Sequence, residues 1–187
     1  VVCRRQRQMC IRDRNKLGIK RQNISLIEGA GVDINKFSLN QFNNRIPTVV
    51  LASRMIWDKG IKEFVKAANI LNNRGIKARF ILVGKPDKEN PRSISISQLN
   101  EWGNLDFIDW VGFKSNMIEV FKNASIVTLP SFYGEGIPKV LIEAMSCSRP
   151  IVTTDMPGCR DLILNQSNGL LVKPKDDLDL ALSLIHI

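Results

Sequence analysis

Short apolar runs that alternate with helical patterns constrain the fold of this chain more than any other feature. Each run is rich in Val or Ile and is bounded by Gly, Pro or Asp, which is typical of parallel strands buried on both faces. The runs are TVVLAS (48–53), ARFILVG (78–84), LDFIDWVG (105–112), SIVTLP (125–130) and PIVTTD (150–155). Five such strands alternating with helices predict an α/β domain, a Rossmann-like parallel sheet with helices on both faces.

The segments between the runs predict the helices. Apolar residues at 61, 64, 65, 68 and 71 recur with a 3.6-residue period, and Gly75 closes this helix. NMIEVFKNA (116–124) and PKVLIEAMSC (138–147) predict two shorter helices. Pro138 opens the second one, because proline fits the first turn of a helix. An amphipathic helix follows near the C-terminus.

The two ends of the chain differ from its middle. Residues 1–14 hold five arginines against one aspartate and so contribute +4 to a net charge of +9. This tail and residues 182–187 resemble translated adapter read-through, so we expect both to be non-native and the chain to be an internal piece of a longer protein. A natural basic arm is the alternative. Residues 15–45, polar and rich in Asn, predict a linker that leads into one domain at 46–181.

Composition excludes several classes of function. The charge outside the tail is +5, spread thinly and without interleaved aromatic residues, so we expect no nucleic-acid partner. None of the four cysteines forms a C-x-x-C pair, which favours reduced thiols over zinc or disulfides. The one histidine, His186, lies in the suspect end, so we expect no histidine base and no His-ligated metal. No apolar run could span a bilayer and no signal sequence is evident, so we expect a cytoplasmic chain.

Polar and glycine residues gather where the predicted strands end. In open α/β sheets a ligand binds beyond the carboxyl ends of the strands. These ends lead to Ser53-Arg54, Gly84-Lys85, Gly112-Phe113 and Pro130-Ser131, the last followed by Tyr133-Gly134-Glu135. The sequence therefore predicts the ligand site at this edge of the sheet.

Two glutamates near this edge, Glu135 and Glu143, are eight residues apart. On a continuous helix they would be separated by about 12 Å. An acid/base pair of a glycosidase needs carboxyl groups roughly 5–9.5 Å apart, so a long ligand contacted at two points fits better. The alternative for Glu143 is an exposed helix residue that pairs with Lys139 one turn earlier.

Several motifs in order resemble glycosyltransferase family 4, whose members have the two-domain GT-B fold. EGIPKVLIEAM (135–145) resembles its motif of two glutamates separated by seven residues. Further similar segments, covering about residues 15–181, are GVDINKF (31–37), SRMIWDKGIKEFVKAA (53–68), FILVGKP (80–86), DFIDWVGF (106–113), RPIVTTDMPGCRDLI (149–163) and NGLLVKP (168–174). The resemblance implies the C-terminal, donor-binding domain of a retaining enzyme.

The resemblance also implies roles for single residues. Arg54 and Lys59 would hold the diphosphate of a nucleotide-sugar donor, and Glu143 would bind the ribose hydroxyls. Glu135 would be the catalytic residue beside the donor sugar. The remaining expected donor contacts are the segment that follows this glutamate and two residues near the base: Gly134, Gly136, Ile137, Lys139, Gly84 and Phe113. No metal or other cofactor is implied, and the aspartates at 177 and 179 fit a solvated helix face better than a manganese site.

Two departures from the family pattern bear on the substrate. Ser53 stands where the family usually has glycine, and Ile137-Pro138 replaces Phe-Gly. The Ile-Pro form resembles enzymes that build bacterial capsule, O-antigen and lipid-linked glycans. This form implies a UDP-hexose or UDP-N-acetylhexosamine as the donor. The family resemblance implies a glycan or lipid-linked acceptor that is bound by a missing N-terminal domain. It also implies that the full enzyme associates peripherally with the inner face of the membrane. The rivals are a nucleotide-sugar epimerase relative and a nucleotide-sugar-binding module without transferase activity.

Overall fold

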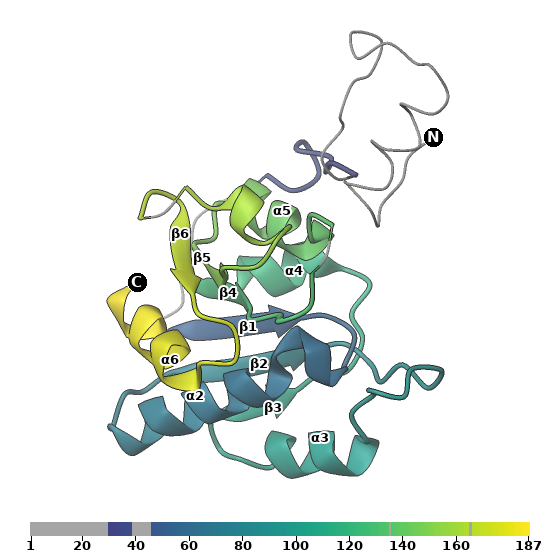
Figure 1. Cartoon of the computed structure of the whole chain (residues 1–187), viewed down its shortest axis with the longest axis vertical. Helices are drawn as coiled ribbons and strands as arrows, with labels where there is room; N and C mark the ends of the chain where they lie inside the picture. The colour runs from purple at the N-terminus through teal and green to yellow at the C-terminus, as the bar shows by residue number, and fades with distance from the viewer. Residues whose placement is uncertain (1–29, 39–45, 135, 165) are drawn as a thin grey trace, which may run out of the picture.

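A computed structural model describes residues 30–38, 46–134, 136–164 and 166–187. Its centre is a six-stranded sheet with the order β3-β2-β1-β4-β5-β6 (Figure 1), and all neighbouring strands pair in parallel. The strands are β1 (Thr48–Ala52), β2 (Arg79–Val83), β3 (Ile108–Trp110), β4 (Ile126–Leu129), β5 (Ile151–Thr154) and β6 (Gly169–Val172). The first five lie inside the five predicted runs, and the predicted Rossmann-like α/β class is confirmed.

Strand β6 was not predicted as a strand. It has only four residues and begins with a glycine, which usually weakens a strand. The structure explains this glycine. A Cβ atom on Gly169 would lie 2.4 Å from the carbonyl oxygen of Ile151 in the neighbouring strand β5. The residue that weakens the sequence signal is therefore the one that permits close pairing at this edge.

Helices cover both faces of the sheet, as predicted (Figure 1). They are α2 (Ile61–Asn73), α3 (Ile96–Gly103), α4 (Met117–Lys122), α5 (Lys139–Ser146) and α6 (Asp177–His186), with short 3-10 turns η2 (Trp57–Lys59) and η3 (Arg160–Leu162). Alternate residues of β1 face opposite layers. Val49 and Leu51 pack with α2, α3 and α6, whereas Val50 and Ala52 pack with α4 and α5. The period-2 alternation of a strand thus supplies two cores from one apolar run.

Helix α2 ends as its sequence predicts. The amide of Gly75 donates to the carbonyl of Asn72 at 2.9 Å, and the amide of Ile76 donates to that of Leu71 at 3.1 Å. This is the Schellman arrangement, in which a left-handed residue satisfies the last carbonyls of a helix. Gly75 has a φ of 74°.

Other helix boundaries differ in detail from the sequence reading. Helix α5 begins at Lys139, so Pro138 is its N-cap and does not lie in its first turn. Helix α3 was not predicted, and its N-cap Ser95 accepts a hydrogen bond from the amide of Gln98 at 3.1 Å. Helix α6 continues to His186, and its buried Leu184 packs into the core. The non-native origin of residues 182–187 stays a prediction.

The chain before β1 is described only in part. Within residues 30–38, Asp33 accepts a hydrogen bond from the amide of Asn35 at 3.0 Å, and Phe37 packs against the core layer of α4 and α5. The tail at 1–14 and most of the expected linker at 15–45 lie outside the described residues. Among the residues that are described, no helix has the length and apolar character needed to cross a bilayer.

Candidate functional site

The candidate site lies where the order of the strands reverses. From β1 the chain runs outward to β2 and β3, and then returns to place β4 on the other side of β1. The segments that follow two adjacent strands therefore diverge and leave room for a ligand between them. Here they are linked at one point, because the Ser131 hydroxyl and the Phe132 amide both donate to the carbonyl of Asp58 at 3.1 Å.

A cavity of about 190 Å³ opens at this reversal point. Arg54 and Lys59 reach it from the segment after β1, and Lys139 reaches it from the first residue of α5. Its other lining residues are Ala52, Ser53, Leu129, Pro138 and Val140. Three cationic side chains and the amino end of a helix favour a negatively charged ligand. The structure thus brings together three of the residues predicted to contact the donor.

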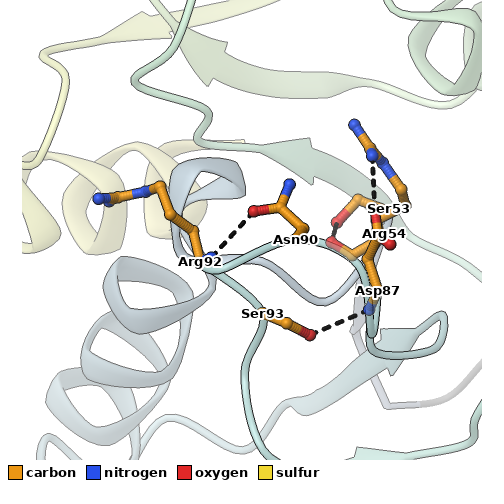
Figure 2. A network of polar contacts seen from close by, with 6 residues as sticks. All are labelled: Ser53, Arg54, Asp87, Asn90, Arg92 and Ser93. Carbon is orange, nitrogen blue, oxygen red and sulfur yellow. Dashed lines mark hydrogen bonds and ion pairs between the residues drawn. The ribbon is translucent and has the colours of Figure 1, made fainter.

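Arg54 is held by its surroundings although its side chain is 61% exposed. Its Nη1 donates to Oδ2 of Asp87 at 2.7 Å, and its carbonyl accepts from the Ser53 hydroxyl at 2.9 Å (Figure 2). A guanidinium group has five N–H donors, so one bond to Asp87 leaves others for a ligand.

Gly60, which was not among the predicted site residues, permits the close contact of the two segments at the cavity. Its φ is 74°, and a Cβ atom there would lie 2.1 Å from the carbonyl oxygen of Pro130. The turn that carries Lys59 can therefore press against the end of β4 only with glycine at this position. The sequence carries little signal for this role, because glycine is a common residue at the N-cap of a helix.

Glu143 is buried, with 8% of its surface exposed, in an otherwise apolar stretch of α5. The alternative prediction, that Glu143 is an exposed helix residue, is therefore wrong, because the residue is buried. The expected pairing is present, because Nζ of Lys139 lies 3.4 Å from Oε1 of Glu143. A buried carboxylate one turn behind a site lysine faces the same side of the helix as that lysine. Glu143 itself does not line the cavity, and its contact with the ribose stays a prediction.

Gly84 and Phe113, expected near the base, lie at the ends of β2 and β3 and do not line the cavity that holds Arg54. Gly84 is tightly enclosed: its amide donates to the Gly112 carbonyl at 2.8 Å, and its carbonyl accepts from Nε1 of Trp110 at 2.9 Å. Phe113 is 66% exposed, with Nζ of Lys85 at 5.7 Å from its ring centroid. An exposed aromatic ring can stack with a base, and this role of Phe113 stays a prediction.

The catalytic prediction for Glu135 lies outside the described residues, as does its expected distance from Glu143. Of its predicted neighbours, Gly134 and Gly136 are exposed and Ile137 is half-buried. None of these three lines the cavity of about 190 Å³. Their assigned contacts with the donor stay predictions.

A larger hollow of about 860 Å³ lies at the opposite edge of the sheet. It is lined by residues at the amino ends of β5 and β6, among them Pro150 and Gly169, and by the end of α6. Nearby, burial lowers the pKa of Arg149 and raises that of the Cys147 thiol. The amino ends of parallel strands are not where ligands of such sheets bind, so size alone does not make this hollow the site. No group of three potential metal ligands occurs among the described residues.

Comparison with known proteins identifies the family. The sequence model described as "Glycosyl transferases group 1" matches residues 33–187. The chain belongs to this family. It is 34% identical over 178 residues to N,N'-diacetylbacillosaminyl-diphospho-undecaprenol alpha-1,3-N-acetylgalactosaminyltransferase of Campylobacter jejuni, with 88% of this chain and 45% of that protein covered. It is 27% identical over 160 residues to the capsular polysaccharide biosynthesis glycosyltransferase CapM of Staphylococcus aureus, with 78% and 40% covered. The chain thus spans less than half the length of these two relatives.

Solved structures agree on the fold. Anabaena HepE in complex with UDP superimposes with a TM-score of 0.70 at 22% identity, covering 83% of this chain and 45% of HepE. The C-terminal domain of a group 1 glycosyl transferase (LpcC) from Francisella tularensis gives 0.68 at 22% identity, and there 83% of this chain and 87% of that domain are covered. The fold of this group 1 glycosyl transferase chain is therefore that of the C-terminal domain of GT-B enzymes.

Proposed function

We propose that this chain is the donor-binding domain of a retaining glycosyltransferase of family 4. The full enzyme would transfer a hexose or N-acetylhexosamine from UDP to a glycan or lipid-linked acceptor. One observation carries the proposal: Arg54, Lys59 and Lys139 converge on a single cavity at the reversal point of the sheet, with the buried Glu143 one turn behind.

The chemistry of the leaving group explains the cations. When the bond from the sugar to the donor phosphate breaks, negative charge builds on the diphosphate. Fixed positive groups that face this charge stabilise the transition state more than the ground state. Arg54 can bind two phosphate oxygens with its planar fork of donors, and Lys59 and Lys139 add point charges. We expect donor binding to need no metal, because these three cations take the place of a divalent ion.

Glu143 would select the nucleoside. A carboxylate with free lone pairs can accept hydrogen bonds from both hydroxyls of a ribose, and a buried position strengthens such bonds. Glu135 would contact the sugar, as the resemblance implies. Glu143 would thus contact the nucleoside, which all UDP-sugar donors share, and Glu135 would contact the sugar, which differs between them.

The relatives support the choice of donor and acceptor. HepE was solved with UDP, and the name of the Campylobacter jejuni relative specifies N-acetylgalactosamine and a diphospho-undecaprenol compound. We therefore favour a UDP-N-acetylhexosamine and a lipid-linked acceptor. The acceptor would bind to the part of the protein that this chain does not include, in a cytoplasmic enzyme that associates with the inner face of the membrane.

Isothermal titration of the chain with UDP tests the proposal. Replacing Arg54 and Lys59 together by Met should weaken UDP binding at least about 100-fold, because hydrogen bonds to charged groups contribute about 1.5–3 kcal/mol each. The matched control replaces Lys62 and Arg74 together by Met. Both side chains are exposed; Lys62 lies on α2, and Arg74 follows the last residue of this helix. This control removes the same net charge and should leave binding unchanged. Equal affinities for the site variant and the control would refute the diphosphate assignment.

A further inference from the structure

The segment 85–94, which follows β2, is bonded along its length to the residues that present Arg54 and Lys59. The Met55 amide donates to the Lys85 carbonyl at 3.0 Å, and the Met55 carbonyl accepts from the Ile94 amide at 2.9 Å. Further along, the Trp57 amide donates to the Arg92 carbonyl at 3.0 Å. The position of the site turn is thus set by a neighbouring segment as well as by its own sequence.

Two ion pairs join the same segments. Nη1 of Arg54 lies 2.7 Å from Oδ2 of Asp87, and Nε of Arg92 lies 2.6 Å from Oδ1 of Asp58. The order of the charges along the chain is opposite on the two segments. Arg54 precedes Asp58 on the first segment, whereas Asp87 precedes Arg92 on the second. Sliding one segment along the other would place like charges together, so the two pairs favour a single register.

Asp87 is itself fixed before it contacts Arg54. Its amide donates to the Ser93 hydroxyl at 3.0 Å, and its carbonyl accepts from the Asn90 amide at 3.0 Å. The Asn90 side chain in turn accepts from the Arg92 amide at 2.9 Å (Figure 2). The Asp87 side chain is 24% exposed, against 61% for that of Arg54. Asp87, whose own backbone is held by hydrogen bonds, therefore restrains the long and exposed side chain of Arg54 beside the cavity.

We propose that Asp87 is a positioning residue of the donor site, which holds the Arg54 guanidinium in its binding orientation before the diphosphate arrives. This inference rests on the function proposed above. An exposed arginine loses rotamer freedom when it binds a ligand, and a partner that has already restricted it reduces this loss. An ion pair this exposed adds little to the stability of the fold, so its main effect falls on ligand binding. The negative charge of Asp87 also repels the diphosphate, and the gain from orienting Arg54 exceeds this repulsion.

The variant Asp87→Asn in the full 187-residue chain tests this inference, with UDP as the titrant. We expect it to bind UDP about 3- to 10-fold more weakly, through the lost orientation of Arg54. The matched control is Glu89→Gln, which removes one negative charge from the same segment at an exposed position. It should bind like the wild type. The midpoint of thermal unfolding should change by less than about 2 °C in both variants, which shows that the fold is intact.

A double-mutant cycle with Arg54→Met separates positioning from other effects. If Asp87 acts through Arg54, adding Asp87→Asn to Arg54→Met causes no further loss of affinity. If Arg54→Met alone binds UDP like the wild type, the diphosphate assignment fails and the inference fails with it. If Arg54→Met weakens binding but Asp87→Asn has no effect, strengthens binding, or adds its loss in both backgrounds, the positioning role is overturned while the donor site stands.

Discussion

Gly60 and Gly75 provide a controlled test of how the site is built, because both have a φ of 74°. Replacing either by Ala places a side chain in the left-handed region, which costs about 1–2 kcal/mol. At Gly75 a new Cβ atom meets nothing within 4 Å. At Gly60 it would lie 2.1 Å from the oxygen and 2.6 Å from the carbonyl carbon of Pro130. These are backbone atoms, so the contact can be relieved only by moving one segment.

We therefore expect Gly60→Ala to lower the free energy of unfolding by about 1–3 kcal/mol more than Gly75→Ala, the usual range for overpacking. For a chain of this size the extra shift in the unfolding midpoint is roughly 2–12 °C. Because the moving segment carries Lys59, only Gly60→Ala should also weaken UDP binding. Denaturant unfolding followed by circular dichroism, with UDP titration of both variants, measures these differences. Equal losses of stability with unchanged binding would refute the close approach of the two segments.

Three further predictions follow from the site and the core. Glu143→Ala should weaken UDP and a UDP-sugar by the same factor, whereas Glu135→Ala should weaken only the UDP-sugar; equal losses for both ligands in the second variant would overturn this division. Burial raises the pKa of the Cys147 thiol, so unfolding releases its proton more readily and the free energy of unfolding should fall as pH rises above about 8.5. Cys147→Ala should show a smaller decline between pH 8 and 10, and an unchanged slope would contradict this. The chain alone should hydrolyse a donor slowly at most, because orientation of two substrates can contribute about 7–11 kcal/mol and needs the acceptor side of the cleft; robust transfer by the purified chain would contradict the proposed domain role.

The sequence predicted the elements whose signals are local and strong. β1 and β2 are continuous apolar runs, and α2 has a complete apolar face and a glycine at its end. β6 and α3 lack such signals. β6 begins with a glycine, which its close pairing with β5 requires, and α3 is a short helix after a long polar segment. In both cases the deciding contacts are distant in the sequence.

Some residues of the candidate site could likewise be predicted from the sequence, and others could not. Arg54 stands directly after a predicted strand, so the rule of strand ends pointed to its position. Lys59 lies further along the chain, and its predicted role, like that of Arg54 in binding the diphosphate, came from the family resemblance. Lys139 was expected as a contact of the donor and as the partner of Glu143, and its place in the cavity depends on how α5 packs beside β4. Asp87 carried no signal of its own, because its effect depends on the fold that brings it to a residue 33 positions away.

A crystal structure of the chain with UDP would show whether the donor diphosphate binds at the carboxyl ends of β1 and β4. We expect the diphosphate oxygens within hydrogen-bonding distance of Arg54 and Lys59, near the first residue of α5, and the ribose hydroxyls at Glu143. UDP bound instead in the hollow at the amino ends of β5 and β6, or bound elsewhere without contacting either cation, would show that these residues do not form the donor site.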